Sequence, residues 1–554
     1  MFGAQPMEDS GALFGLLESL FPVRFESRSN NDYDSLAGVV LMHGDRDAAN
    51  QVSDLGLPVF VVLHDEGTRI PSEGAKVTLT HNSVLPRPMR GQTLEVRESL
   101  DVAIVAARTD EVVVAAMQGE PIWVLGWRGG AARHFVGTPL PALAGKDFLY
   151  EHVNDKQFIC FLPLIQFLRD LTAADAWTPP PIRASFIFDD PNLHWKRYGH
   201  VDYREMARHA EKHNYHAAFA TVPLDAWFVH RDTADLFREN KGRLSLLVHG
   251  NNHVRSELGR SFSEEDALAL AAQALRRIAW LERRSGVEVS YVMAPPHGPC
   301  SEAMMRGMVR VGFEAACISQ GWLRELRRES DCRSRIGLAM SENVAGLHLI
   351  PRFGMSSRNF RTRILLAAYL DQPVIPAGHH EDAANGLELL EQLASFLNTL
   401  GDVHWMDMKS IVRSNFSMRR EKEVLYVKMF SRIIRLKVPE EVKQLCIERP
   451  WLNAGAAERL RWREDQTDFK VIDSYGEEPI AIKSGAELEI TSVCSGLIHP
   501  DNVPGLSPPL WAIARRQFCE VRDRLSPAVG RLLGSSMAKA KSDRLALSEL
   551  RQRQ

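Results

Sequence analysis

The segment SFIFDDP (185–191) is a short apolar run of β-forming residues, followed directly by two carboxylates and a proline. Such a run is typical of a buried β-strand. The same pattern of an apolar run with polar residues at its end recurs in LSLLVHGNNH (244–253), VEVSYVMAPPHG (287–298) and PVIPAGHHED (373–382). Segments with helical periodicity, such as 203–213 and 264–284, lie between these runs. The alternation predicts a parallel α/β structure in the middle of the chain.

The polar ends of these four runs are the candidate functional residues. In a (β/α) barrel the carboxyl ends of all strands lie at one face, and that face holds the active site. The four ends together supply one carboxylate pair, one H-x-x-x-H and two further histidines. One Asp with two His forms a three-ligand metal site with an open position, and a second carboxylate and histidine can move protons. The residues therefore predict a metal-dependent hydrolase.

In this order, the residues resemble the motifs of the polysaccharide deacetylase superfamily, the NodB-homology group that includes carbohydrate esterase family four. The resemblance covers roughly 182–416, which is under half of the chain. It implies a distorted (β/α) barrel of deacetylase type with one zinc or similar divalent metal. It also implies removal of acetyl groups from N-acetylated sugars, or cleavage of a related amide.

The resemblance assigns a role to each motif residue. Asp189 matches the catalytic base, and three residues match the metal ligands: Asp190, His249 and His253. His379 matches the general acid, and His380 is the alternative because adjacent strand-end residues point in opposite directions. The metal would be Zn²⁺ or another divalent ion that accepts an Asp-His-His set, such as Co²⁺, Ni²⁺, Fe²⁺ or Mn²⁺.

The third motif departs from the family pattern of Arg-x-Pro-Tyr-Gly. Its backbone next to Pro296 and His297 would hold the oxyanion, but Ala294 stands in place of the arginine. Arg352 is the candidate replacement for that cation, and His194, just after the Asp pair, is a candidate for lining the substrate groove. Because the metal set is kept while the groove is altered, we expect a divergent member with a different substrate.

The segments on either side of the barrel predict accessory domains. Apolar runs at 36–44, 58–63, 100–107 and 120–126 indicate a Rossmann-like α/β domain with a parallel sheet. Alternation over 424–439 indicates a β domain. We expect five parts: an α/β domain (1–148), a helical and proline-rich connector (149–181), the barrel (182–416), a small β domain (417–506) and a helical tail (507–554).

The composition limits the class of protein. The 554 residues are 45% hydrophobic and 25% charged, which is typical of a globular chain. The net charge of −3 does not favour a nucleic-acid partner, and no run of 18 or more apolar residues indicates a membrane span. Seven cysteines without a C-x-x-C, and a start unlike a signal peptide, predict a cytoplasmic protein. We expect a carbohydrate or other small-molecule substrate, and the flanking domains leave a homo-oligomer or a protein partner open.

Two other functions fit the same residues. In one, the barrel is a catalytically inactive module that binds a glycan or serves as a scaffold. In the other, the enzyme hydrolyses a cyclic amide or ureide.

A second histidine pair, His209 and His213, repeats the H-x-x-x-H spacing on an expected surface helix. Because no carboxylate run lies near them in the sequence, we expect no metal site there.

Overall fold

The computed structural model describes most of the chain between residues 13 and 533. The residues in this span that it does not describe are 16, 19, 28–32, 34, 64–67, 72–73, 97–99, 142–157, 176, 320–338, 453–458, 466, 473–478, 495 and 508–509. The first part of the expected connector, up to residue 157, and the expected tail beyond residue 533 therefore lie outside the described residues.

Seven parallel strands close into a barrel in the middle of the chain, which confirms the predicted (β/α) barrel. Neighbouring strands are hydrogen-bonded in the order β17-β16-β15-β14-β11-β20-β19, and pairing of β19 with β17 closes the ring. The strands are β11 (Phe186–Asp189), β14 (Ala217–Thr221), β15 (Leu244–Val248), β16 (Val289–Met293), β17 (Ala315–Ser319), β19 (Leu347–Gly354) and β20 (Pro376–Gly378). The short β18 (Glu342–Val344) pairs antiparallel with β19 at the rim.

Helices cover the outside of the barrel, and local signals set their ends. The Asp202 side chain caps α5 by accepting hydrogen bonds from two backbone N–H groups, and the Ser263 side chain caps α7 by accepting one from the Asp266 N–H. Gly286 ends α7 in the left-handed conformation, with φ of +67°. The barrel helices are α5 (Tyr203–His213), α6 (Arg231–Glu239), α7 (Glu264–Ser285), α8 (Glu302–Val311), α10 (Phe360–Tyr369), α11 (Glu388–Thr399) and α12 (Met408–Arg413).

The alternation of side chains along the strands separates two cores. In β11, Phe186 and Phe188 pack outward into the large core beneath the helices. Ile187 points inward and joins a small core inside the barrel together with Leu247 and Ile350. Residues two positions apart in a strand face the same side. Each inward-facing residue therefore predicts the direction of the strand-end residue two positions later.

The N-terminal domain has a mixed sheet, so the predicted parallel sheet holds only for three of its strands. In the order β1-β2-β9-β8-β7-β4-β5, the pairs β1–β2 and β2–β9 are parallel and the others are antiparallel. Among the described residues of this domain, one helix, α2 (Arg46–Asp54), makes a crossover, between β1 and β2. Two-residue turns with positive φ, at 118–119 and 129–130, join β7 to β8 and β8 to β9. Such turns connect antiparallel strands.

The strands of this domain are β1 (Val39–Gly44), β2 (Val59–Leu63), β4 (Lys76–Leu79), β5 (Thr93–Glu95), β7 (Val112–Met117), β8 (Glu120–Arg128) and β9 (Ala131–Val136). The expected strand at 100–107 is only β6 (Asp101–Ala103), which pairs with β3 (Arg69–Pro71) outside the main sheet. The helix α4 (Phe158–Leu171) is buried between this domain and the barrel, and one continuous core includes all three. No helix in the described ranges is long and apolar enough to cross a membrane.

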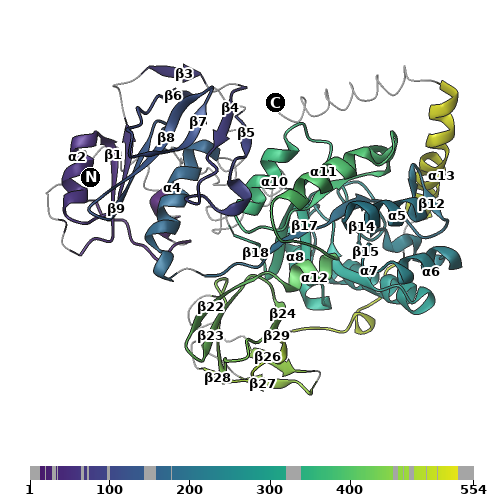
Figure 1. Ribbon diagram of the computed structural model, residues 1–554. Coiled ribbons are helices and arrows are strands. Elements are labelled where there is room, and N and C mark those ends of the chain that lie inside the picture. Colours follow the sequence, from purple (N-terminus) through teal and green to yellow (C-terminus); the bar gives the residue numbers. More distant parts are fainter. Residues whose placement is uncertain are drawn as a thin grey trace.

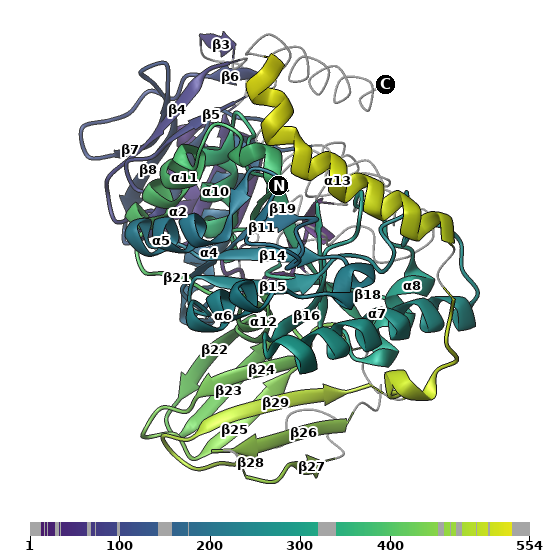
Figure 2. The ribbon, with the colours of Figure 1, turned by 90° about the vertical axis from the view of Figure 1, so that its right-hand side faces the viewer.

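Two four-stranded sheets follow the barrel and share one apolar core, as the sequence predicted for a small β domain. One sheet contains β22 (Phe416–Glu421), β23 (Val424–Met429), β25 (Gln444–Glu448) and β28 (Ile480–Ala481); the other contains β24 (Ile433–Lys437), β29 (Glu487–Val493), β26 (Arg459–Glu464) and β27 (Lys470–Ile472). In Figure 1 these sheets lie below the barrel, with the N-terminal sheet on the left. The last helix, α13 (Leu510–Leu533), then returns to the barrel, and Figure 2 shows it lying across the barrel.

A buried arginine joins the start of the barrel to its end. Arg183, in β10 (Ile182–Ala184), donates from Nη1 to Asn415 Oδ1 at 2.6 Å and to the Ser414 carbonyl at 3.3 Å. Its Nη2 donates to the Asp371 carbonyl. Burial lowers the pKa of Arg183 to about 10, and the guanidinium remains charged at neutral pH. Its position therefore depends on these acceptors.

Replacing Asn415 with Ala is expected to lower the free energy of unfolding by about 2 kcal/mol, because a buried charged donor loses its side-chain acceptor. The effect is measured as a lower urea midpoint of the Trp fluorescence transition. Asn385→Ala, at an exposed position, is the matched control and should leave the midpoint unchanged. Equal midpoints for the two variants would contradict this role of Asn415.

Candidate metal centre

Strand alternation directs two of the predicted residues into the barrel mouth. Ile187 in β11 and Leu247 in β15 face the barrel interior. Asp189 and His249 lie two positions further along and face the same way. Both side chains are buried. The carboxyl ends of β11 and β15 thus bring a carboxylate and an imidazole to one site, although β14 lies between them.

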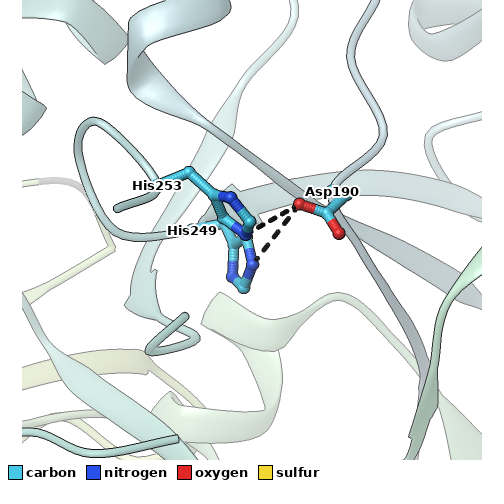
Figure 3. Close-up of side chains that lie close together, drawn as sticks. All are labelled: Asp190, His249 and His253. Carbon is cyan, nitrogen blue, oxygen red and sulfur yellow. Dashed lines mark ion pairs between the residues drawn. The ribbon is translucent and has the colours of Figure 1, made fainter. Parts of the chain in front are cut away.

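Asp190 and His253 reach the same site through unusual backbone conformations. Their φ angles are +85° and +55°, a region that residues other than glycine rarely adopt and that is often found at functional sites. Asp190 Oδ1 lies 2.9 Å from His253 Nε2 and 3.9 Å from His249 Nε2. Figure 3 shows both imidazoles directed at this one carboxylate oxygen. The three side chains form a compact cluster of ligand type.

The protonation of the cluster suits a metal. His249 Nδ1 donates to the Ala294 carbonyl at 2.7 Å, which leaves Nε2 facing Asp190. Burial lowers the pKa of His249 to about 4, and the imidazole is therefore neutral at neutral pH. Burial would raise the pKa of Asp190, but His253 and then Arg516 hold that pKa well below its ordinary value. A neutral imidazole and an ionised carboxylate are the forms that bind metals.

The distances also fit a metal. A tetrahedral zinc site with bonds of about 2.0–2.1 Å places its ligand atoms about 3.3 Å apart. The two separations of 2.9 and 3.9 Å from Asp190 Oδ1 lie on either side of that value. All three ligand atoms, one from each residue, lie within 4.8 Å of one another. The donor set and its spacing therefore fit a divalent ion.

A buried carboxylate builds the loop that carries the histidines. Glu257 accepts hydrogen bonds from the backbone N–H groups of Asn251, Asn252 and His253, at 2.8 to 3.0 Å. Gly250 precedes them with φ of +62°, and a Cβ there would come within 2.4 Å of Pro296 Cγ. A residue with a Cβ at this position would clash, which explains the glycine.

Asp189 forms a buried ion pair with Arg352. Arg352 Nη1 donates to Asp189 Oδ1 at 2.7 Å. Ile350 in β19 faces the barrel interior, and the alternation turns Arg352 in the same direction. Burial would raise the pKa of Asp189, but Arg352 and His249 bring it below its ordinary value. A cation therefore lies against Asp189 although position 294 has no arginine.

His379 and His380 follow directly after β20 and have different surroundings. Ile375 and Ala377 face the barrel interior, and His379 continues that side. Partial burial lowers the pKa of His379, but the charges of Asp189 and Asp190 outweigh it and raise the pKa above its ordinary value. Of these two histidines, His379 is therefore the one that interacts electrostatically with Asp189 and Asp190.

His380 and His194, in contrast, lie beneath α13. His380 is buried, with Nε2 3.7 Å from Asp523 Oδ1. His194 is buried too, with Nδ1 3.0 Å from Glu520 Oε1 and Nε2 2.8 Å from the Asp225 carbonyl. Both nitrogens of His194 thus bind protein groups, and its place in a substrate groove stays a prediction.

The third-motif residues border the cluster. Pro296 is buried and packs against Gly250. His297 is exposed, with φ of +59°, and its ring centroid lies 5.4 Å from that of His253. His297 is therefore next to the cluster at its solvent side, where a substrate would arrive.

No pattern in the sequence pointed to Arg516. This buried residue of α13 donates from Nη2 to the Asp190 carbonyl at 2.8 Å, and its Nη1 lies 3.4 Å from Asp190 Oδ1. It also pairs with the buried Asp225, with Nη2–Oδ2 at 2.6 Å. Arg515, the preceding residue of the helix, donates to the His253 carbonyl. The helix α13 therefore contacts the backbone of two cluster residues.

The missed residues differ in how far a local signal could have revealed them. Glu257 lies four residues after His253, and a carboxylate close to a ligand loop is a readable signal. Arg516 lies 326 positions from Asp190, in a helix without a motif. No spacing rule connects residues so distant in the sequence.

Similarity to known proteins was found among solved structures. No family model matches the chain, and no curated protein matches it. The crystal structure of Agd3, titled a novel carbohydrate deacetylase, matches with a TM-score of 0.46 and 9% identity, covering 88% of this chain and 97% of that chain. The Bacillus subtilis peptidoglycan deacetylase PdaC matches with a TM-score of 0.25 and 14% identity, covering 42% and 91%.

A family 4 carbohydrate esterase from Streptomyces lividans, in complex with acetate, matches with a TM-score of 0.25 and 12% identity, covering 42% of this chain and 93% of that chain. All three structures are named as deacetylases or carbohydrate esterases. The similarity to this chain is at low sequence identity throughout.

Replacing Glu257 with Gln is expected to weaken zinc binding at the cluster by about 10–100-fold, since an amide nitrogen would face backbone N–H groups that now meet a carboxylate. Competition with a chromophoric chelator measures the affinity. Glu265→Gln, on the exposed first turn of α7, is the matched control. An affinity unchanged in Glu257→Gln would show that the carboxylate does not position the ligands.

The imidazole of His379 is expected to titrate above its ordinary pKa in the metal-free protein. Replacing Asp189 with Asn removes a negative charge and should lower this pKa, because the imidazolium loses a stabilising neighbour. Added Zn²⁺ should lower it too, by offsetting the charge of Asp190. NMR titration of ¹³C-labelled histidine measures all three values, with His379→Gln for assignment. A pKa of His379 that changes in neither case would show that His379 does not interact with the cluster.

Proposed function

We propose that this protein is a metal-dependent hydrolase that removes the acyl group from an N-acetylated sugar or a related small amide. One observation supports this most directly. Asp189, held ionised by Arg352, lies beside the cluster of Asp190, His249 and His253 at the carboxyl face of a closed parallel barrel. A ligand set and a separate ionised carboxylate are the two parts that hydrolysis by activated water requires.

The chain would hold Zn²⁺, or another divalent ion such as Co²⁺, Ni²⁺, Fe²⁺ or Mn²⁺, through these three residues. When bound, such an ion supplies Lewis acidity, which polarises an amide carbonyl and makes water more acidic. The protein supplies the fixed geometry. Ala294 orients His249 through its carbonyl group, and Glu257 holds the loop that carries His253.

Asp189 is the proposed base. Its carboxylate is ionised at neutral pH because Arg352 lowers its pKa, and it can therefore accept a proton from the attacking water. The hydrogen bond from Arg352 fixes the orientation of one carboxylate oxygen and leaves Oδ2 for the proton. Arg352 thus takes the part of the missing third-motif arginine in this proposal.

His379 is the proposed acid. The carboxylates Asp189 and Asp190 raise its pKa, which increases the fraction of imidazolium near neutral pH. A protonated imidazole can donate a proton to the leaving amine. The backbone N–H at His297, after the buried Pro296, is the proposed donor to the oxyanion. We assign no substrate contact to His194 or His380, because both pack beneath α13.

The expected consequence is that metal and activity separate in two variants. His249→Ala should lose the ion at this cluster and with it the hydrolysis of N-acetyl sugars. Asp189→Asn should keep the ion but lower kcat by about 10²–10⁴-fold, the usual contribution of a general base. Elemental analysis and acetate release from a panel of N-acetyl sugars and cyclic imides measure the two effects.

His404→Ala, at a partly exposed position distant in the sequence from every motif, is the control and should match the wild type in both measurements. Turnover of cyclic imides alone would replace the proposed substrate with a cyclic amide or ureide. Bound glycan without turnover in the metal-loaded wild type would contradict hydrolysis and favour a binding module. Equal activity of Asp189→Asn and wild type would exclude Asp189 as the base.

A further inference from the structure

A second group of ligand-type side chains lies outside the catalytic cluster. His209 and His213 are four residues apart on α5, and therefore on one face of the helix. Glu391 comes from α11, far away in the sequence. One ligand atom from each residue lies within 4.8 Å of the others. No carboxylate run lies near this histidine pair in the sequence. In the structure, a different helix supplies the carboxylate.

The packing of α5 against α11 holds these residues together. Asn398, on α11, donates from Nδ2 to the carbonyl groups of His213 and Asn214, both at 3.1 Å. Glu391 precedes Asn398 by seven residues, which is two helical turns, and so lies on the same face of α11. His213 Nδ1 lies 3.7 Å from Glu391 Oε1. Both views show the two helices side by side (Figures 1 and 2).

The hydrogen bonds of His209 leave one nitrogen suited to a metal. Its Nδ1 lies 3.0 Å from the Tyr215 hydroxyl group, whose own hydrogen is donated to Met206 Sδ. The Tyr215 oxygen therefore accepts from His209 Nδ1, and Nε2 carries the lone pair. Burial and then the neighbouring His213 lower the pKa of His209, which favours the neutral ring. A hydrogen bond on the opposite ring nitrogen is the usual support of a metal-binding histidine.

His213 has a buried nitrogen without a hydrogen bond. Its side chain is 11% exposed, and Nε2 has no partner among the residues that the structure describes. Leaving a buried polar atom unsatisfied costs free energy. Its ring lies over that of His209, with centroids 4.2 Å apart. Glu391, which is 48% exposed, connects the pair to solvent and gives an ion a path of entry.

We propose that His209, His213 and Glu391 form a second site for a divalent metal of borderline softness, with Zn²⁺ the best match to two imidazoles and one carboxylate. The two helices pack on the outside of the barrel, so the site is separate from the catalytic cluster at the carboxyl ends of the strands. An ion there would link α5 to α11 across the outside of the barrel. Its role is to stabilise the packing of these helices, separately from hydrolysis.

Metal counting in the full-length protein tests this site apart from the first. Wild type equilibrated with Zn²⁺ and desalted should hold two equivalents, His249→Ala one, and His249→Ala with His213→Ala none. In the His249→Ala background, Zn²⁺ should raise the Tm by several degrees, as a ligand that binds only the folded state does. Adding Glu391→Gln should abolish this shift and weaken zinc binding by more than about 100-fold, since it removes a direct ligand.

Glu388→Gln on the same helix is the matched control, because its side chain is exposed and outside the group. Glu391→Gln changes only a partly exposed carboxylate and should fold normally, which keeps the test valid if His213→Ala does not fold. A His249→Ala protein that binds no zinc and shows no Tm shift would overturn the second site. One equivalent that survives His249→Ala but is lost in Glu391→Gln would support the second site even if the catalytic cluster held no metal.

Discussion

The closure of seven parallel strands is the constraint on which this site depends. Once β19 pairs with β17, the inward-facing positions of all strands share one narrow space. Its lower part is filled by apolar side chains, including several alanines. The next inward-facing residue of a strand comes two positions beyond its last inward apolar side chain. These residues then meet at the mouth of the barrel. Asp189, His249, Arg352 and His379 all arrive there by this single rule.

Charge balance determines what can happen at that mouth. Two adjacent carboxylates in a buried place repel each other, and one would be protonated without cations. Arg352 neutralises Asp189 and Arg516 approaches Asp190, so the two are supported by different arginines. This separation leaves the Asp190 oxygen that faces His249 and His253 available to the proposed ligand set, and it leaves Asp189 for the proposed role of base. The division of roles in the proposed function follows from these two ion pairs.

The helix α13 adds a feature that the barrel does not require. Its polar face places Arg516, Glu520 and Asp523 against the barrel mouth, where they bind Asp225, His194 and Tyr198. A helix usually packs through apolar residues, whereas this one docks through ion pairs and hydrogen bonds. The helix α13 is therefore part of the wall around the candidate site.

Local pattern determined the strands, the order of the motifs and the ligand set, because each depends on residues close together in the sequence. The alternation in 185–191 and 244–253 is enough to predict strands with polar ends. The mixed N-terminal sheet was missed, although the turn at 129–130 between two β-rich runs was a readable hairpin signal. Tertiary structure alone decided the contacts between distant segments: Arg352 with Asp189, Arg516 with Asp190, and Glu391 with His213. An ion pair between residues more than a hundred positions apart leaves no periodicity in the sequence, since only the packed fold brings its two charges together.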